Sequence, residues 1–273
     1  MTSRGVVYMA WGQAAIEQAE ASMASLWRLA DLPVLVVGDA DAAAHFCGMR
    51  GVEVCTPDVE PFDPERKAGY QFLAGRVKPL LYGLSPWAET LYVDADSAFR
   101  RDPAKGFDLL ERWEFVVAET ETRTLADSIA GAAETQWTAN WCGVPWLLYH
   151  NSGMLFWRKG PAVEGLFGLW AEEWRRFQGW DEQVALLRAL LRSEALYLTV
   201  PHLWNTRTPG RAMLLYHRFG VGVARRGDVA QEEAAAARLT EKGRMIRIQV
   251  GRGRYVQCRP EEAETYRERY GRK

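Results

Sequence analysis

Two carboxylates, two residues apart, follow a short apolar run in the first half of the chain. Leu91, Tyr92 and Val93 predict a buried strand that leads directly into Asp94 and Asp96. Side chains at i and i+2 of an extended backbone point to the same side, so we expect the two carboxylates to lie close together and repel each other. A divalent ion such as Mg²⁺ or Mn²⁺ relieves this repulsion, prefers carboxylate oxygen and commonly keeps phosphate oxygens among its ligands. The pattern therefore predicts a metal site for a diphosphate; the alternative is that the aspartates only form a turn or cap a helix.

The elements that must position these aspartates alternate between strand and helix. Residues 5–10 (GVVYMA) and 33–38 (PVLVVG) are apolar runs typical of strands covered on both faces, and residues 13–30 between them repeat apolar side chains at helical spacing. We predict further strands at 51–55, 91–93, 115–118, 155–157, 195–200, 213–216, 245–250 and 255–258, and helices at 72–84, 103–113, 161–177, 181–191 and 230–240. Pro79 should break or bend the helix at 72–84, and residues 120–149 are expected to cover a substrate. This order predicts an α/β fold with a mixed central sheet.

Composition excludes several classes of protein. A net charge of −1 over 273 residues gives no electrostatic reason to expect nucleic acid or an anionic membrane as the partner of the whole chain. The four cysteines are far apart and form no metal or redox motif, so we expect buried thiols. We find no secretory signal and no apolar run of membrane-spanning length, and we predict a cytoplasmic protein. We expect a catalytic domain at 1–227 with a basic extension, 228–273, packed on it.

Several short motifs resemble, in their order along the chain, those of the GT-A type nucleotide-sugar glycosyltransferases. The closest resemblance is to family 8, which includes glycogenin and bacterial galactosyltransferases, and it covers about residues 4–223. The motifs are the strand VYMA, the basic pair in GRVKPLLYG, YVDAD, HNSGMLFW, WDEQVAL, PHLWN and the histidine of YHRFG. The resemblance implies a GT-A type, Rossmann-like nucleotide-diphospho-sugar transferase fold, here with a small C-terminal α+β addition.

The resemblance also implies roles for individual residues. The metal ligands would be Asp94, Asp96 and His217, with Mn²⁺ or Mg²⁺ as the ion. The donor-binding residues would be Tyr8, Ala10, Asp39, Arg76, Lys78, Asp94, Ala95, Asn151, Ser152, Gly153, His217 and Gly220. The catalytic residues would be Asp181, Glu182 and Gln183.

The implied reaction is the transfer of a hexose from a UDP-sugar donor to an acceptor, with retention of the anomeric configuration. Departure of the leaving group builds negative charge on the diphosphate, so an ion and cationic side chains such as Lys78 and Arg76 would stabilise the transition state more than the ground state. The family has Asp-Gln where this chain has Asp181, Glu182 and Gln183. The carboxylate of Glu182 can act as a base or a nucleophile, whereas an amide cannot.

The chain also departs from the family pattern, and each motif has a structural alternative. Val223 stands where the family has a lysine after its histidine, with Arg225 and Arg226 as the nearest cations. His217 is otherwise a core histidine, the Asn-Ser-Gly run a turn, and the basic pair a solvated helix face. Two other functions therefore remain open: a sugar-1-phosphate nucleotidyltransferase, although its usual glycine-rich loop is missing here, and a nucleotide-sugar binding protein without catalysis.

The C-terminal stretch bears on the acceptor. Residues 225–273 carry more Lys and Arg than Asp and Glu, and Arg244, Arg247, Arg252 and Arg254 recur through strand-like runs. A basic face of this kind suits an anionic acceptor, such as a phosphorylated sugar, a lipid headgroup or modified nucleic acid. The alternative is an ordinary solvated strand face.

Overall fold

The structure is a computed structural model that describes residues 3–59, 69–128, 131–177, 182–217, 246–251 and 254–258. Contacts divide the chain into two compact units. The first comprises residues 1–207 and 211–223, and the second residues 208–210 and 224–273. The predicted helix at 230–240 lies outside the described residues, as do the side chains of the predicted basic face.

A seven-stranded mixed sheet forms the centre of the first unit, with strands in the order β3-β2-β1-β4-β7-β6-β8. The strands are β1 (Arg4–Ala10), β2 (Val34–Gly38), β3 (Val52–Cys55), β4 (Glu89–Val93), β6 (Phe115–Thr124), β7 (Leu148–Arg158) and β8 (Tyr197–Val200). β1, β2, β3 and β4 are parallel, whereas β7 runs antiparallel to both β4 and β6. The predicted α/β fold with a mixed sheet is confirmed.

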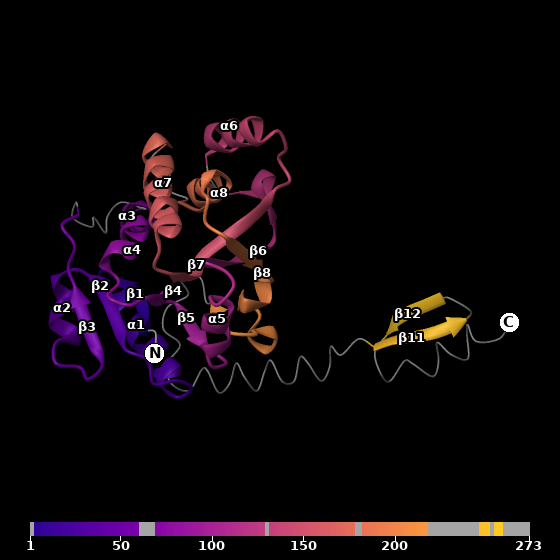
Figure 1. The fold of residues 1–273 in the computed structure, drawn as a ribbon. Coiled ribbons are helices and arrows are strands. Elements are labelled where there is room, and N and C mark those ends of the chain that lie inside the picture. Colours follow the sequence, from indigo (N-terminus) through magenta and orange to yellow (C-terminus); the bar gives the residue numbers. More distant parts are fainter. Residues whose placement is uncertain are drawn as a thin grey trace. The chain divides into compact units, whose positions relative to one another are not determined.

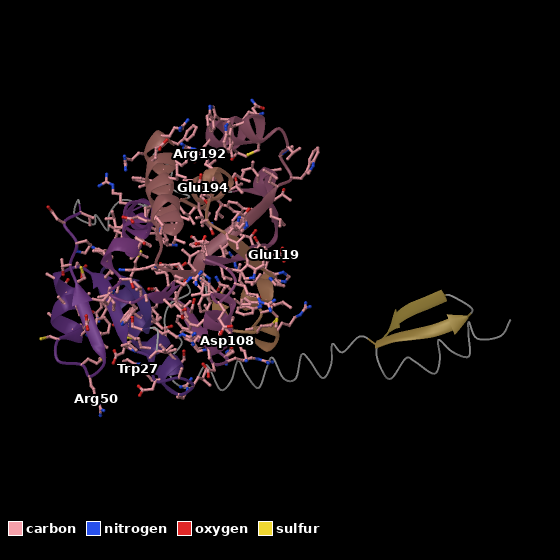
Figure 2. All side chains as sticks on the ribbon, viewed as in Figure 1. Trp27, Arg50, Asp108, Glu119, Arg192 and Glu194 are labelled. Atoms are coloured by element: carbon pink, nitrogen blue, oxygen red, sulfur yellow. The ribbon has the colours of Figure 1, made fainter. Side chains whose placement is uncertain are left out.

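Helices cover both faces of this sheet (Figure 1), and Figure 2 shows the side chains on the same ribbon. They are α1 (Gln13–Trp27), α2 (Ala40–Phe46), α3 (Gly69–Val77), α4 (Leu81–Leu84), α5 (Ala104–Leu109), α6 (Ala132–Cys142), α7 (Pro161–Phe177) and α8 (Glu182–Arg192). Alternate residues of β1 enter opposite cores: Val6 and Tyr8 pack with α1, α2 and α5, while Val7 and Met9 pack with α3, α7 and α8. Both faces are apolar because both are covered.

A small second sheet lies in the same unit. It contains β5 (Ser97–Phe99), β10 (Leu215–His217) and β9 (Asn205–Thr206), in the order β5-β10-β9. β5 follows β4 after a three-residue turn, and it pairs antiparallel with β10, which lies more than a hundred residues later in the chain. This pairing is the feature of the fold that assembles the site.

Most predicted elements are present, with shifted ends. The break expected at Pro79 is a short 3-10 helix, Lys78–Leu80, between α3 and α4. The sequence patterns did not predict α2, α6 and β5. They predicted a strand at 115–118 only, whereas β6 continues to Thr124 through polar residues. The expectation of buried thiols is wrong for the described cysteines, because Cys47 is exposed and Cys55 and Cys142 are half-buried.

In the second unit, β11 (Ile246–Gly251) and β12 (Arg254–Cys258) pair antiparallel, close to the predicted strands. Throughout the described ranges, no helix combines the length and the apolar character needed to cross a bilayer.

Candidate active site

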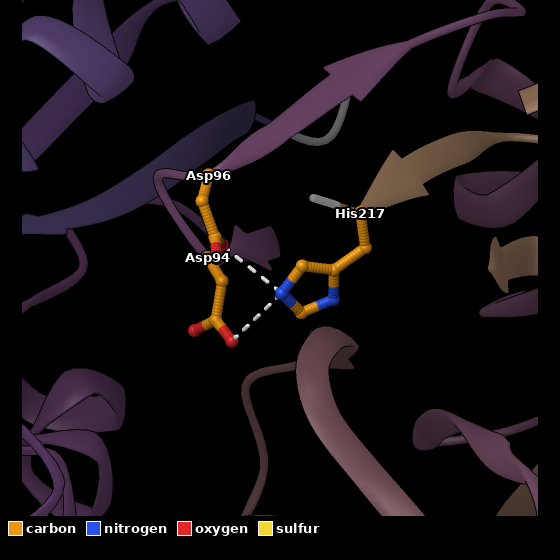
Figure 3. Close-up of side chains that lie close together, drawn as sticks. All are labelled: Asp94, Asp96 and His217. Carbon is orange, nitrogen blue, oxygen red and sulfur yellow. Dashed lines mark ion pairs between the residues drawn. The ribbon is translucent and has the colours of Figure 1, made fainter. Parts of the chain in front are cut away.

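The two aspartates converge with His217 at the end of β4. His217 Nε2 lies 3.0 Å from Asp96 Oδ1 and 3.7 Å from Asp94 Oδ2 (Figure 3). The pairing of β10 with β5 brings the histidine to this place, because His217 pairs with Ser97, the residue after Asp96. The imidazole is 3% exposed, whereas both carboxylates keep some contact with solvent. The three residues that the sequence predicted as metal ligands are therefore neighbours.

The aspartates converge for a different reason from the one expected. β4 ends at Val93, and residues 94–96 form a turn in which Ser97 N donates to Asp94 O. The side chains are thus brought together by the turn and not by strand alternation. Tyr92, which the sequence predicted only as a strand residue, donates its hydroxyl to Asp94 Oδ1 at 2.5 Å. A hydroxyl-bearing side chain two residues before the first aspartate was the available signal.

This donor set fits a divalent ion. One ligand atom from each of Asp94, Asp96 and His217 lies within 4.8 Å of the others. Two carboxylates and one imidazole suit Mn²⁺, which accepts nitrogen better than Mg²⁺ does. A side chain at Gly153 would fill this space, since its Cβ would lie 2.6 Å from both Asp94 Oδ2 and His217 Cε1. The glycine therefore keeps open the space between two of the three ligands.

A register shift in β7 places Gly153 there. Pairing of β6 with β7 passes from Val117 opposite Leu155 to Ala118 opposite Asn151, so β7 bulges around Ser152 to Met154. At the bulge, Gly153 O accepts from Asp94 N and Gly153 N donates to Asn151 Oδ1. The Asn-Ser-Gly run is thus part of a strand and not the turn offered as its alternative.

Lys78 links the metal-site carboxylates to the start of α8. Its Nζ is 2.8 Å from Glu182 Oε1, 2.9 Å from Ser152 Oγ and 3.2 Å from Asp94 Oδ1, and the side chain is buried. Burial by itself lowers the pKa of Lys78, but the charges of Asp94 and Glu182 outweigh it and raise that pKa above its usual value. The ammonium group therefore remains charged in this buried position. The solvated helix face offered as an alternative for Lys78 is wrong.

Glu182 and Gln183 contact different atoms of Ser152. Glu182 Oε1 accepts from Ser152 Oγ at 2.5 Å, and the Glu182 side chain is buried. Gln183 Oε1 accepts from Ser152 N, and Gln183 Nε2 donates to the hydroxyl of Tyr149, which the sequence did not single out. The amide of Gln183 therefore holds β7, while the carboxylate of Glu182 joins the charged cluster.

The other predicted donor-binding residues come from β1, the turn after β4, the residue before α2 and the last turn of α3. The Tyr8 side chain is fully buried and its hydroxyl lies 3.1 Å from Ser22 Oγ, while its backbone pairs with Val93, the residue before Asp94. Ala10 and Ala95 are also buried. Asp39 caps α2 by accepting from Ala42 N, and it also accepts from Gly12 N, which ties together the ends of β1 and β2.

Arg76 is half-buried in the last turn of α3, two residues before Lys78. Asp181, predicted to be catalytic, and Gly220, predicted to bind the donor, lie outside the described residues.

The comparisons with known proteins found structural relatives only. No protein-family model matches the chain, and no curated protein sequence matches it. The apo form of mouse xyloside xylosyltransferase 1 is 14% identical with a TM-score of 0.51, over 74% of this chain and 87% of that one. An active-site glutamine-to-glutamate mutant of LgtC is 15% identical with a TM-score of 0.53, over 82% of this chain and 80% of that one.

The glycosyltransferase GlyE of Streptococcus pneumoniae is 16% identical with a TM-score of 0.52. The match covers 89% of this chain and 64% of GlyE, so this chain spans less than two thirds of that protein. A likeness at such low identity establishes the architecture alone: this chain has the fold of the GT-A glycosyltransferases.

Proposed function

We propose that this protein is a metal-dependent glycosyltransferase that moves a hexose from a UDP-sugar to an acceptor with retention of configuration. The observation that carries the proposal is the convergence of Asp94, Asp96 and His217 beside the Lys78–Glu182 pair, within a GT-A fold. A nucleotide-sugar binding protein without catalysis would not require this combination of ligands and buried charges.

The charges of the site suit an anionic donor bound through a cation. The carboxylates of Asp94 and Glu182 both contact the ammonium group of Lys78, and Asp96 lies beside Asp94 and His217. A divalent ion, held by Asp94, Asp96 and His217, would offset the repulsion between the two aspartates and stabilise the charge that develops on the diphosphate. Lys78 is fixed by three contacts and requires little reorganisation during the reaction.

Glu182 is the group that we propose to attack the sugar. Its bonds to Lys78 and Ser152 both use Oε1, which orients the carboxylate and leaves Oε2 to act. In the first step Oε2 bonds to the anomeric carbon while the bond from that carbon to the diphosphate breaks, and its electron pair leaves with UDP. In the second step the acceptor hydroxyl attacks the same carbon, the ester to Glu182 breaks, and the hydroxyl proton passes to the released carboxylate. Two inversions give net retention.

A cavity in the region of α6 bears on the acceptor. This cavity, of about 540 Å³, lies in the segment that was predicted to cover a substrate. The described residues that line it are uncharged and include the polar Thr135, Gln136 and Asn140. Trp146, next to the lining residue Pro145, is 71% exposed and offers a flat surface for a sugar ring. These features favour a neutral saccharide acceptor over an anionic one.

A donor screen by thermal unfolding, with and without Mn²⁺, tests the proposal. A UDP-sugar that binds the parent protein through the ion should raise its melting temperature only when Mn²⁺ is present. At a donor concentration a hundredfold above Kd, binding stabilises the folded protein by about 2.7 kcal/mol. Asp96→Ala should remove the Mn²⁺-dependent part of this rise in melting temperature. Asp108→Ala, which alters an exposed carboxylate paired with Lys105, is the matched control and should respond as the parent does. An equal Mn²⁺-dependent shift in Asp96→Ala and the parent would refute the metal site.

A product assay separates the remaining functions. The glycosyltransferase should slowly release free UDP from the donor with Mn²⁺. A nucleotidyltransferase should instead form pyrophosphate from a nucleoside triphosphate and a sugar phosphate, and a binding protein should form neither product. With an acceptor in hand, the anomeric configuration of the product by NMR decides between retention and inversion.

A further inference from the structure

Asn205 lies directly behind the histidine of the metal site. It begins β9, which runs parallel to β10, and Asn205 is paired with Leu215, two residues before His217. Its Oδ1 lies 3.1 Å from His217 Nδ1, on the side of the imidazole ring away from the aspartates. Both side chains are buried, with exposures of 1% and 3%.

We propose that Asn205 is a positioning residue that fixes the tautomer of His217. A neutral imidazole carries one proton, which sits on either Nδ1 or Nε2. A carbonyl oxygen facing Nδ1 accepts that proton in a hydrogen bond and so leaves the lone pair of Nε2 directed at Asp94 and Asp96. Only this tautomer can ligate a metal through Nε2.

The opposite tautomer has a specific attraction in this protein. Asp96 Oδ1 is 3.0 Å from Nε2, so a proton on Nε2 would form a charge-assisted hydrogen bond with that carboxylate. Such a bond would occupy the nitrogen and one carboxylate at once. The acceptor supplied by Asn205 biases the histidine against this closed arrangement.

The amide nitrogen of Asn205 also supports a role beyond packing. Asn205 Nδ2 is buried and has no hydrogen-bond partner among the residues that the structure describes. A buried donor left without a partner destabilises the folded state. An apolar side chain of similar shape would avoid this cost, so the amide is explained by what its oxygen does for His217.

Titration of the full chain with Mn²⁺ alone, followed by the EPR signal of the free ion, tests the inference, which rests on the proposed metal site. Asn205→Leu removes the acceptor and should weaken Mn²⁺ binding by about 10- to 100-fold. Asn205→Asp keeps an acceptor at the same place and should bind at least as tightly as the parent. Gln13→Leu, a change at an exposed glutamine of α1, is the control and should bind as the parent does.

A double-mutant cycle identifies the route of the effect. If Asn205 acts through His217, Asn205→Leu should add no further weakening to His217→Ala. Equal weakening in both backgrounds would show a general structural role and overturn the inference, as would unchanged affinity in Asn205→Leu. Failure of the parent to bind Mn²⁺ would overturn the proposed metal site itself, which makes the two failures distinguishable.

The tautomer can also be read without any variant. In ¹⁵N-labelled parent protein free of metal, the neutral His217 ring should show its proton on Nδ1 by long-range ¹⁵N–¹H correlation. A proton on Nε2 in the parent would refute the inference even if every variant failed to fold.

Discussion

Two groups of buried charged side chains each include one residue of α8, and they differ in how their charges are paired. At the start of the helix, Glu182 joins Lys78 and Asp94, where carboxylates outnumber the ammonium group and a further aspartate and histidine lie alongside. Further along the helix, Arg188 is fully buried and donates to Glu134, Glu173 and the hydroxyl of Thr138. Both groups contain short, buried ion pairs, so burial and pairing alone do not mark a functional site.

The difference is in how completely the charges are compensated. Around Arg188, the carboxylates of Glu134, Glu172 and Glu173 meet the guanidinium groups of Arg176, Arg188 and Arg192. Burial would raise the pKa of Glu173, but hydrogen bonds from Arg188 and Arg192 outweigh it and lower that pKa. This group joins α6, α7 and α8, and its ion pairs between described residues use three carboxylates and three guanidinium groups. Around Lys78, by contrast, the carboxylates of Asp94 and Glu182 share one ammonium group.

Glu182→Gln should give the largest effect on the reaction. The amide keeps the size of the side chain and a hydrogen-bond acceptor but cannot attack the anomeric carbon, so turnover should fall by about 10²- to 10⁴-fold. The Mn²⁺ affinity should be unchanged, because Glu182 is not among the proposed ligands. Glu172→Gln, which alters a half-exposed carboxylate of the other group, is the control for turnover. Full activity of Glu182→Gln with an added donor and acceptor would exclude Glu182 as the nucleophile.

Arg188→Met should give the largest effect on stability. It leaves two buried glutamates short of a counter-charge and should lower the free energy of unfolding by about 3–5 kcal/mol in urea titrations. Mn²⁺ affinity, measured where the variant is folded, should not change. Arg192→Met, at a partly exposed position, should cost about 1 kcal/mol or less. A loss of Mn²⁺ affinity in folded Arg188→Met would mean that the two groups are coupled and the contrast between them is wrong.

Gly153→Ala tests the space that the metal site requires. The added methyl group would approach Asp94 Oδ2 and His217 Cε1 to 2.6 Å, so one ligand must move and Mn²⁺ affinity should fall about tenfold or more by isothermal titration. Gly165→Ala adds the same group on α7, where no atom lies within 4 Å, and should leave affinity intact. Equal affinities in the two variants would show that Gly153 is not needed to keep the ligands apart.

His150 offers a buried group that belongs to neither set of ion pairs, and its predicted effect is the smallest. Burial lowers the pKa of His150 to about 4, although Glu119 opposes this shift. Because the unfolded chain takes up the proton first, stability should decline as pH falls from about 6.5 toward 4, by about 2 kcal/mol between pH 7 and pH 5. Urea titrations at the two pH values should show this loss in the parent, and less of it in His150→Gln. An identical loss in both proteins would assign it to other groups.

Local patterns in the sequence predicted much of the fold. The helix at 161–177 was predicted with its observed ends, because its apolar residues repeat at helical spacing and are buried on one side. The apolar runs of β1, β2 and β4 likewise predicted strands covered on both faces. By contrast, α6 was missed because it is only weakly amphipathic, with exposed tryptophans on a helix that buries few residues.

The sequence by itself determined which residue types were available for the site: two carboxylates after a buried strand, a basic pair before it, and a histidine far along the chain. Only the tertiary structure decided that these groups meet, because the register of β5 with β10 places His217 opposite Ser97. It also decided that Asn205 stands behind that histidine and that Glu182, and not Gln183, joins Lys78. Strand register and helix packing depend on contacts between residues distant in the chain, and no local pattern of residues specifies them.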